Sequence, residues 1–509
     1  MSALHSAFRF LTALLAVTVL TSACSGSSPP ESGGADTDAT ESDNASNAAE
    51  TASGDQSDDA SSTTTQPAGT VSLPQDSPIS SAPGVETDKI RIGVMIRDVN
   101  QLLGSGFVED LTVTQQVDRW RAEAARINDS GGINGRTVEI VVATWDPLVP
   151  ESVLAACDRV VDRDAFVVLN VSGLETIATN CLIDPHARPV IVGENPTLAN
   201  FDDAGDLLFS LEPPREILVR AALNRFEQKG WLVGRVAVVH NDLPGDLAAA
   251  QTAIEQLENL GYDVVSQEIP VSQGVEAARE SLRSKIDELV AGQTETMLFL
   301  SNSTIAGPFG EAMESAGATW TNLIVDADNI ADPFAAARLG RQWIGAHAVG
   351  VFGGATMPET SVDAACREGW DRFLNGEYGD RPRGDWSFSA GLEARSTRGA
   401  AADSIDPPGD IGYTECLLMH VVFDALERVP LNFTVVDFVE ALETGGRIPM
   451  PLGVKGSFSE SEHWLADRSG LLQFLGSDSG FCPTTGRNCF VPQGGDRRSF
   501  RPLPKRPTG

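Results

Sequence analysis

The chain offers few side chains that could carry out catalysis. Beyond the N-terminal segment there are five histidines: His186, His240, His347, His420 and His463. A hydrolase needs such a base beside a nucleophile, and His240, which follows a strand-like run, is the best placed of them. Gly-x-Ser-x-Gly, Ser-x-x-Lys, His-Glu-x-x-His and phosphate-loop patterns do not occur in credible form. The sequence therefore predicts no catalytic residue, and it does not favour a hydrolase.

The cysteines predict disulfide bonds rather than a metal site. Six of the seven follow position 24, and no CxxC pair or Cys/His cluster occurs, so the pattern does not favour zinc or any other metal. An even number in an exported chain indicates disulfides, although six cysteines allow fifteen connectivities. Pairing of neighbours along the chain is the simplest expectation: Cys157 with Cys181, Cys366 with Cys416, and Cys482 with Cys489.

The first residues indicate export. Arg9 precedes an apolar run from Leu11 to Leu20, and about ten apolar residues are too few to span a bilayer but suit a signal peptide. Small residues lead into Cys24, which resembles the lipoprotein signal in which that cysteine becomes the lipidated first residue. We therefore predict a lipoprotein signal over 1–24, and the alternative is an ordinary secretory signal cleaved nearby. The Ser-, Thr- and Asp-rich segment 25–87 predicts a disordered acidic tether.

Composition limits the partners of the folded part. The formal charge of −34 excludes nucleic acid, which requires clustered Lys and Arg. It also opposes adsorption to an anionic membrane, so attachment would come from the lipid alone. After the signal and tether about 420 residues remain, which is enough for two lobes rather than one core.

Alternation of strands and helices predicts the fold class. Helical periodicity is clear where apolar residues step by three and four, as from Val113 to Ile127 and from Leu247 to Leu257. Further helices are expected at Tyr413–Arg428 and Thr434–Thr444, and a disordered tail is expected from Gly494. The order predicts α/β structure with two doubly wound, Rossmann-like lobes. The expected strands are 89–96, 138–143, 166–170, 189–192, 235–240, 263–268, 296–300, 322–325, 346–351 and 471–475.

One phrase connects this pattern to a known family. The residues Ile127-Asn128-Asp129-Ser130-Gly131-Gly132-Ile133-Asn134-Gly135-Arg136 lie between the first helix and the second strand. The glycines suit the positive-φ turn that ends a helix, and Asn134-Gly135 suits the turn into a strand. The phrase, in this position, resembles the type I periplasmic-binding proteins, and most of all the branched-chain amino acid and amide receptors of ABC importers.

The resemblance covers most of 88–480 and implies a domain organisation. It implies two lobes joined by a multi-strand hinge, with a ligand cleft between them. Lobe I would comprise 88–212 and 345–455, and lobe II would comprise 213–344 and 456–480, followed by a C-terminal loop and tail over 481–509. The spacing of Cys157 and Cys181 is similar to that of a disulfide that some members carry in the first lobe.

The resemblance also implies ligand-binding residues. In lobe I it points to loops after the first, third and fourth strands, with Gly104, Ser105, Ser172, Glu175 and Thr197. Helix N-capping is an equally good role for Ser172 and Thr197. In lobe II it points to Asp242, Asn302 and Asp326, the last with a turn or capping role as the alternative. Lobe II lacks the aromatic residue usual after its first strand, so an amide, polyol or cationic solute stands beside an amino acid.

The expected function is that of an extracytoplasmic receptor. It would capture a small polar solute by closure of two lobes and deliver it to an ABC permease, as a monomer without a cofactor. A related receptor that signals to a membrane partner, an exported hydrolase and a purely structural lipoprotein are the alternatives.

Overall fold

The computed structural model describes residues 82–98, 112–146, 149, 151–171, 181–193, 195–326, 330, 336, 339–351, 360–384, 413–450, 455–482, 488–493 and 501–506.

The first α/β sheet is parallel throughout. The strand order of this sheet is β2-β1-β3-β4-β5, so β2 and β5 form its edges. Its strands are β1 (Lys89–Arg97), β2 (Thr137–Trp145), β3 (Val167–Asn170), β4 (Val190–Val192) and β5 (Leu208–Ser210).

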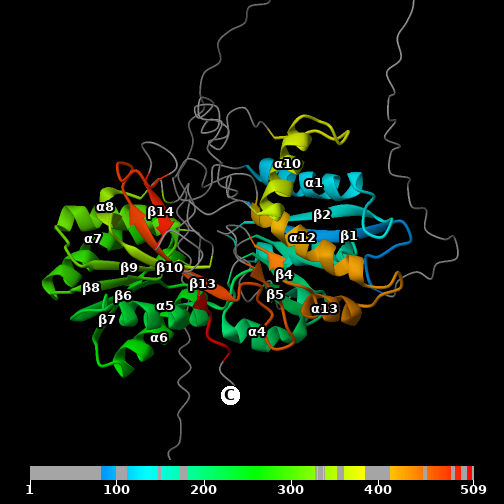
Figure 1. Cartoon of the computed structure of the whole chain (residues 1–509). Helices are drawn as coiled ribbons and strands as arrows, with labels where there is room; N and C mark the ends of the chain where they lie inside the picture. Colours follow the sequence, from blue (N-terminus) through cyan, green and yellow to red (C-terminus); the bar gives the residue numbers. More distant parts are fainter. Residues whose placement is uncertain are drawn as a thin grey trace, which may run out of the picture. The chain divides into compact units, whose positions relative to one another are not determined.

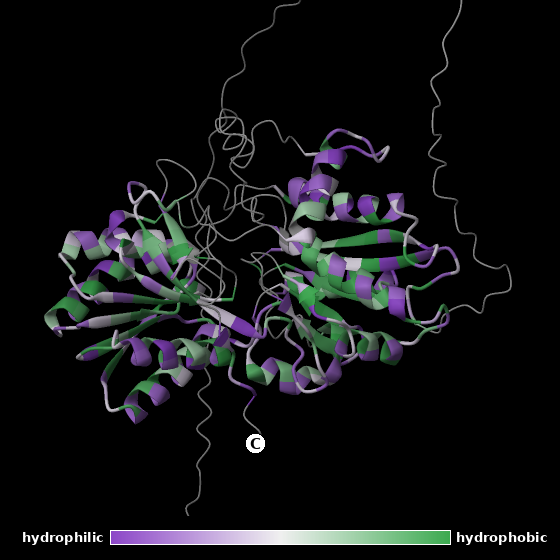
Figure 2. Ribbon diagram, in the orientation of Figure 1, coloured by the Kyte–Doolittle hydropathy of each residue, from purple (hydrophilic) through white to green (hydrophobic). Residues whose placement is uncertain are grey.

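Helices cover both faces of this sheet because alternate strand residues point to opposite sides. Ile92 and Val94 pack on the side of α1 (Val113–Asp129), while Val141 and Ala143 pack on the side of α2 (Ser152–Asp162). Other helices that pack against this sheet include α4 (Leu198–Ala204), α10 (Ser361–Leu374), α12 (Tyr413–Arg428) and α13 (Val435–Glu443). Figure 2 shows the strands of this sheet as mainly hydrophobic and the helices with mixed faces.

The turn from α1 into β2 has the geometry that its sequence predicts. α1 ends at Asp129, and four of the next six residues have positive φ: Gly131, Gly132, Asn134 and Gly135. A Cβ on Gly132 would lie 2.1 Å from the backbone oxygen of Arg136, whereas a Cβ on Gly131 would meet nothing within 4 Å. Asn128 then bonds the first part of β2, because its side chain donates to the Val138 oxygen and accepts from the Val138 N–H.

The second sheet has the order β14-β13-β10-β9-β8-β6-β7, with β15 paired to β13. Val236 and Val238 face α5 (Arg215–Lys229) and α6 (Pro244–Asn259), and Ala237 and Val239 face α7 (Val275–Ala291) and α8 (Ser303–Ala316). Figure 1 shows these helix pairs on opposite faces of the sheet. The strands are β6 (Arg235–Asn241), β7 (Asp263–Ile269), β8 (Thr296–Phe299), β9 (Thr321–Asp326), β10 (His347–Gly350), β13 (Arg468–Leu475), β14 (Cys489–Pro492) and β15 (Arg501–Pro502).

Two of the segments that connect the sheets run side by side. The chain leaves the first sheet after β5 and later returns through 463–467 to β13. The backbone N–H of Ser210 donates to the backbone oxygen of His463 at 2.9 Å. The backbone N–H groups of Leu465 and Ala466 donate in turn to the backbone oxygens of Ser210 and Leu211. Parallel segments of this kind agree with the predicted multi-strand hinge, and the two α/β sheets confirm the predicted fold class.

The three predicted disulfides are present. Their Cα–Cα distances are 6.3 Å for Cys157–Cys181, 5.8 Å for Cys366–Cys416 and 5.6 Å for Cys482–Cys489. The second of them joins α10 to α12.

The structure corrects some boundaries. β10 pairs with β9 and β13, so 347–350 lie in the second sheet, whereas the sequence division placed 345–455 in lobe I. Gly456, assigned to lobe II, pairs with Ile448 in the short ladder of β11 (Ile448–Pro449) and β12 (Lys455–Gly456). The tail from Gly494 was predicted to be disordered, but its β15 pairs with Arg468 and Ser469. β5 and β14 were not predicted from the sequence.

Substitution of Gly132 by alanine should destabilise the fold more than substitution of Gly131. Both positions have positive φ and share the backbone penalty, but only at Gly132 would the new Cβ collide with a backbone oxygen. We expect Gly132→Ala to lower the free energy of unfolding by about 2 kcal/mol more than Gly131→Ala, measured by urea denaturation. Equal losses would contradict this account of the turn.

Candidate functional site

The candidate site lies at the carboxyl ends of the parallel strands, where doubly wound sheets bind ligands. The loop after β4 passes Gly193, whose Cβ would lie 2.5 Å from the Val171 oxygen at the end of β3. A glycine therefore lets the ends of these strands approach closely. The loop then continues through Asn195 to Thr197, where α4 begins.

Arg215 joins this loop to the second sheet. It is the first residue of α5, directly after Pro214. Its Nε donates to Asn195 Oδ1 at 3.0 Å, and its guanidinium also donates to Asp246 Oδ1 near the start of α6. The Asp246 side chain is 2% exposed, which makes this a largely buried ion pair. Removal of one partner from such a pair leaves the other charge desolvated.

The network continues along the second sheet. Asn241, the last residue of β6, donates from Nδ2 to Asp246 Oδ2 at 2.9 Å, and its Oδ1 accepts a 2.6 Å bond from Ser301 Oγ after β8. Asn241, Asp246 and Ser301 are all buried. One polar chain thus runs from the loop after β4, through Arg215, to the ends of β6 and β8.

One buried donor in this hydrogen-bond network has no partner among the described residues. Asn195 is 5% exposed, and its Nδ2 has no hydrogen-bond partner among the residues that the structure describes. A buried amide donor without a partner costs free energy, so Asn195 offers a donor to a ligand.

A second contact links the same elements. Leu198 N–H, in the first turn of α4, donates to Glu216 Oε1 and Oε2 at 3.1 and 3.2 Å. Burial raises the pKa of Glu216 above its ordinary value of 4.5, and the N–H groups of Glu216 and Leu198 and the nearby Arg215 partly offset that rise.

Thr197 caps α4, which is the alternative role that its sequence allows. Its Oγ1 accepts from the Asn200 N–H, and the Asn200 side chain accepts from the Thr197 N–H at 2.9 Å. Thr197 also lies beside the second sheet, because a Cβ on Gly245 would be 3.8 Å from both Thr197 Cγ2 and Arg215 Cδ. Its ligand role stays a prediction.

The predicted residues of lobe II lie on neighbouring strands. Asp242, after β6, accepts from the N–H of Ser272 at 2.8 Å and from its hydroxyl. Asn302 precedes α8 and accepts from Ile305 N–H at 3.3 Å as its N-cap. Asp326 ends β9, which pairs with β8. The structure therefore places these three positions along one edge. Gly104, Ser105, Ser172 and Glu175 lie outside the described residues.

The sequence interpretation missed Arg215 and Asp246, and it did not single out Asn195 or Asn241. A usable signal exists for Arg215, because it follows Pro213-Pro214 and opens a helix. Asp246 has the weaker signal of an acid in the first turn of a helix, which more often serves the helix dipole. Trp145, the last residue of β2, packs in the core with Val141 and Val153.

His240 lies within hydrogen-bond distance of a serine, a pairing that also occurs in hydrolases. Its Nε2 lies 2.9 Å from Ser266 Oγ, and its Nδ1 lies 2.8 Å from the Asn241 oxygen. Both residues stand within neighbouring strands, and Ser266 is exposed. Among the described residues, no group of three or more His, Cys, Asp or Glu side chains could hold a metal ion.

Comparison with known proteins shows which fold this chain shares. Residues 111–350 match the family model "Periplasmic binding protein". The fold is a periplasmic-binding-protein fold. The predicted resemblance to type I members is thereby confirmed. Among curated proteins, none matches the chain in sequence. None of the described helices is long and apolar enough to cross a membrane.

Solved structures share this fold at low sequence identity. The fatty acid ABC transporter substrate-binding protein from Thermomonospora curvata is 14% identical, with a TM-score of 0.56, over 83% of this chain and 96% of that one. A solute-binding protein of an ABC transporter from Rhodopseudomonas palustris BisB5, in complex with 3,4-dihydroxybenzoic acid, is 12% identical. Its TM-score is 0.58, and the match covers 82% of this chain and 98% of that one. A branched-chain amino acid ABC transporter protein from Thermus thermophilus with bound valine is 15% identical. Its TM-score is 0.55, and the match covers 80% of this chain and 96% of that one.

Loss of the Asp246 charge should destabilise the protein strongly. Asp246→Asn removes the carboxylate from a largely buried pair with Arg215, so we expect the free energy of unfolding to fall by about 3 kcal/mol. The exposed pair of Arg283 and Asp287 provides the control, since Asp287→Asn should change it by less than about 1 kcal/mol. Denaturant unfolding measures both variants, and similar small losses would show that the Arg215 pair contributes little.

The raised pKa of Glu216 predicts a pH dependence. The folded protein holds this proton more tightly than the unfolded chain, so the contribution of Glu216 to the free energy of unfolding falls as pH rises from below 4.5 through the raised pKa. Glu216→Gln should remove that fall while its amide oxygen still accepts from Leu198. Urea midpoints across about pH 4 to 8 measure this, with Glu280→Gln on α7 as the control for loss of one carboxylate. Parallel pH profiles for wild type and Glu216→Gln would contradict the assignment.

Proposed function

We propose that this chain is an extracytoplasmic solute-binding receptor. It captures a small polar solute, an amino acid or an amide-like molecule, by closure of two lobes and delivers it to an ABC importer. The observation that carries the proposal is the polar chain from Asn195 through Arg215 and Asp246 to Asn241 and Ser301, which joins the carboxyl edges of both sheets. A solute held at both edges would favour a closed arrangement of the lobes by its differential affinity.

The chemistry of the solute follows from the polar groups at these edges. Asn195 has a buried Nδ2 donor without a partner among the described residues, and such a donor suits a carboxylate or carbonyl oxygen. Valine and 3,4-dihydroxybenzoic acid, the solutes in two of the similar structures, both carry a carboxylate. Thr197, Asp242, Asn302 and Asp326 remain the proposed further contacts.

The N-terminal segment gives the proposed location. Signal peptide 1–24 exports the chain, and Cys24 carries the lipid that attaches it to the outer face of the cytoplasmic membrane. The acidic tether 25–87 separates the receptor from that surface, and like charge keeps it away from anionic lipids. The partners are then a small solute and a membrane permease, with the receptor acting as a monomer and without catalysis.

A thermal-shift panel of amino acids, amides, polyols, polyamines and aromatic carboxylates tests this function on the full chain. A solute at a hundred times its dissociation constant stabilises the folded state by about 2.7 kcal/mol, or several degrees. Asn195→Ala should remove most of the shift, whereas Asn224→Ala, an exposed asparagine on α5, should keep it. A folded chain that no solute class stabilises would contradict the proposed function.

A further inference from the structure

The C-terminal tail, residues 501–506, runs back along the crossing segment 463–467, through which the chain returns to β13. The first two residues of the tail form β15, which pairs antiparallel with the first two residues of β13. Leu503 then donates its backbone N–H to the backbone oxygen of Asp467 at 2.9 Å, and its side chain packs against the buried core. The tail therefore lies beside the crossing segment and runs in the opposite direction.

The other end of the tail reaches a helix that packs on the first sheet. The guanidinium of Arg506 forms an ion pair with the carboxylate of Asp202 in α4. The neighbouring Phe201 contacts the crossing segment at the same place, because its ring meets the Trp464 ring edge-on with 5.7 Å between the ring centroids. Figure 1 shows the tail, in dark red, extending from β13 towards α4. The tail thus joins the second sheet to the first.

The composition of the tail suits a taut connection. Residues 501–507 contain three prolines, three basic residues and no acid, in a chain whose formal charge is −34. Proline fixes φ and favours extended chain, so a segment of this kind acts as a semi-rigid spacer rather than as a slack loop. Its positive charge attracts it to a carboxylate such as that of Asp202.

A link that is held at both ends opposes movement of the lobes. Rotation of two lobes is absorbed by φ and ψ changes in a few residues of the segments that connect them. A rotation that separates β13 from α4 must therefore break either the β15 ladder or the ion pair of Arg506 with Asp202. A contact that is present in one arrangement and absent from another shifts the equilibrium between them by its own free energy.

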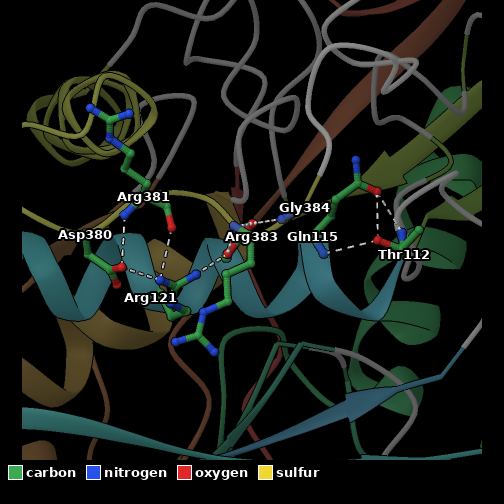
Figure 3. A network of polar contacts seen from close by, with 8 residues as sticks. Thr112, Gln115, Arg121, Asp380, Arg381, Arg383 and Gly384 are labelled. Carbon is green, nitrogen blue, oxygen red and sulfur yellow. Dashed lines mark hydrogen bonds and ion pairs between the residues drawn. The ribbon is translucent and has the colours of Figure 1, made fainter. Parts of the chain in front are cut away.

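Another network of polar contacts lies within the part of the chain that surrounds the first sheet. The fully buried Asp118 of α1 accepts from two backbone N–H groups of the segment 380–384, at 2.8 and 2.7 Å, and Arg121 of α1 forms an ion pair with Asp380. Figure 3 shows these contacts fixing the segment to one side of α1. Because α1 packs on the first sheet, the pair of Arg121 and Asp380 does not join the two sheets.

We propose that the tail is a strap across the hinge, which favours the arrangement of the two sheets seen in this structure. It is bonded to the start of β13 at one end and to α4 at the other, so it acts on the lobe movement without contacting the solute. The inference rests on the lobe closure of the proposed function, but it does not depend on which solute is bound.

Distances between spin labels in the full chain, measured by double electron–electron resonance without solute, test this proposal. The labels are attached at Leu154→Cys on α2 and at Glu280→Cys on α7, which are exposed positions on helices of different sheets, with Cys24→Ser in every variant. Asp202→Asn, which removes only the ion pair, should increase the share of molecules outside the wild-type distance peak about two- to fivefold. Deletion of 501–509 should increase that share at least as much.

Asp380→Asn is the matched control. Asp380 is 51% exposed and Asp202 is 65% exposed, and each pairs with an arginine. Only the pair of Asp202 joins the two sheets, so Asp380→Asn should leave the distance distribution as in wild type. At about 1 M salt the Debye length falls to about 3 Å, and the wild-type distribution should then approach that of Asp202→Asn.

Two outcomes would overturn the proposal. One is an unchanged distance distribution after deletion of 501–509, and the other is an equal effect of Asp202→Asn and Asp380→Asn. If the deletion variant does not fold, as judged by circular dichroism, the comparison of the two point variants decides. Because the distances are measured without solute, a failure of solute binding would contradict the proposed function and leave this result unaffected.

Discussion

The guanidinium of Arg215 is the contact on which the site depends. It bonds Asn195 in the loop after β4 and Asp246 at the start of α6, so one side chain fixes the carboxyl ends of both sheets to each other. Because Asp246 is buried, its charge requires this partner, and the position of Arg215 is set by the start of α5 after Pro214. The need to pair this buried charge therefore holds the loop after β4 close to the start of α6.

In the second sheet the hydrogen-bond network continues from Asp246 through the amide of Asn241 and the hydroxyl of Ser301, which are uncharged groups. Asn241 bonds Asp246 and Ser301, which spaces the ends of β6 and β8. On the first sheet Gly193 allows β3 and β4 to end close together. Neutral groups can exchange partners at lower cost than a buried charge, so these neighbours of Arg215 are the suitable places for a ligand to enter the network.

Much of the fold could be predicted from the sequence because its signals are local. Helical spacing gave α1 and α12, and the glycine-rich turn after α1 has the positive φ values that its residues require. β15 was not predictable, because two residues rich in Arg and Pro show no periodicity and pair only in the tertiary structure. β10 was assigned to the wrong lobe since its sequence does not reveal which neighbours it pairs with.

The sequence predicts that the site lies at the carboxyl ends of the strands, but it does not predict which side chains form the hydrogen-bond network there. The resemblance predicts Thr197, Asp242 and Asn302 as ligand contacts in loops after strands, and that role stays a prediction, because the structure gives each of them a capping or turn bond. Arg215 and Asp246 are 31 residues apart and meet only through folding, so no spacing rule indicates their pairing. Charge complementarity over such distances becomes visible only in three dimensions.

Hydrogen exchange of the full chain with and without a mixture of branched-chain amino acids, aromatic carboxylates and amides tests the central claim most directly. If the two carboxyl edges form one solute site, exchange should slow together in 193–198, 241–246 and 301–305. Slowing at one edge alone, or at neither, in a chain that remains folded would contradict a shared site built around Arg215.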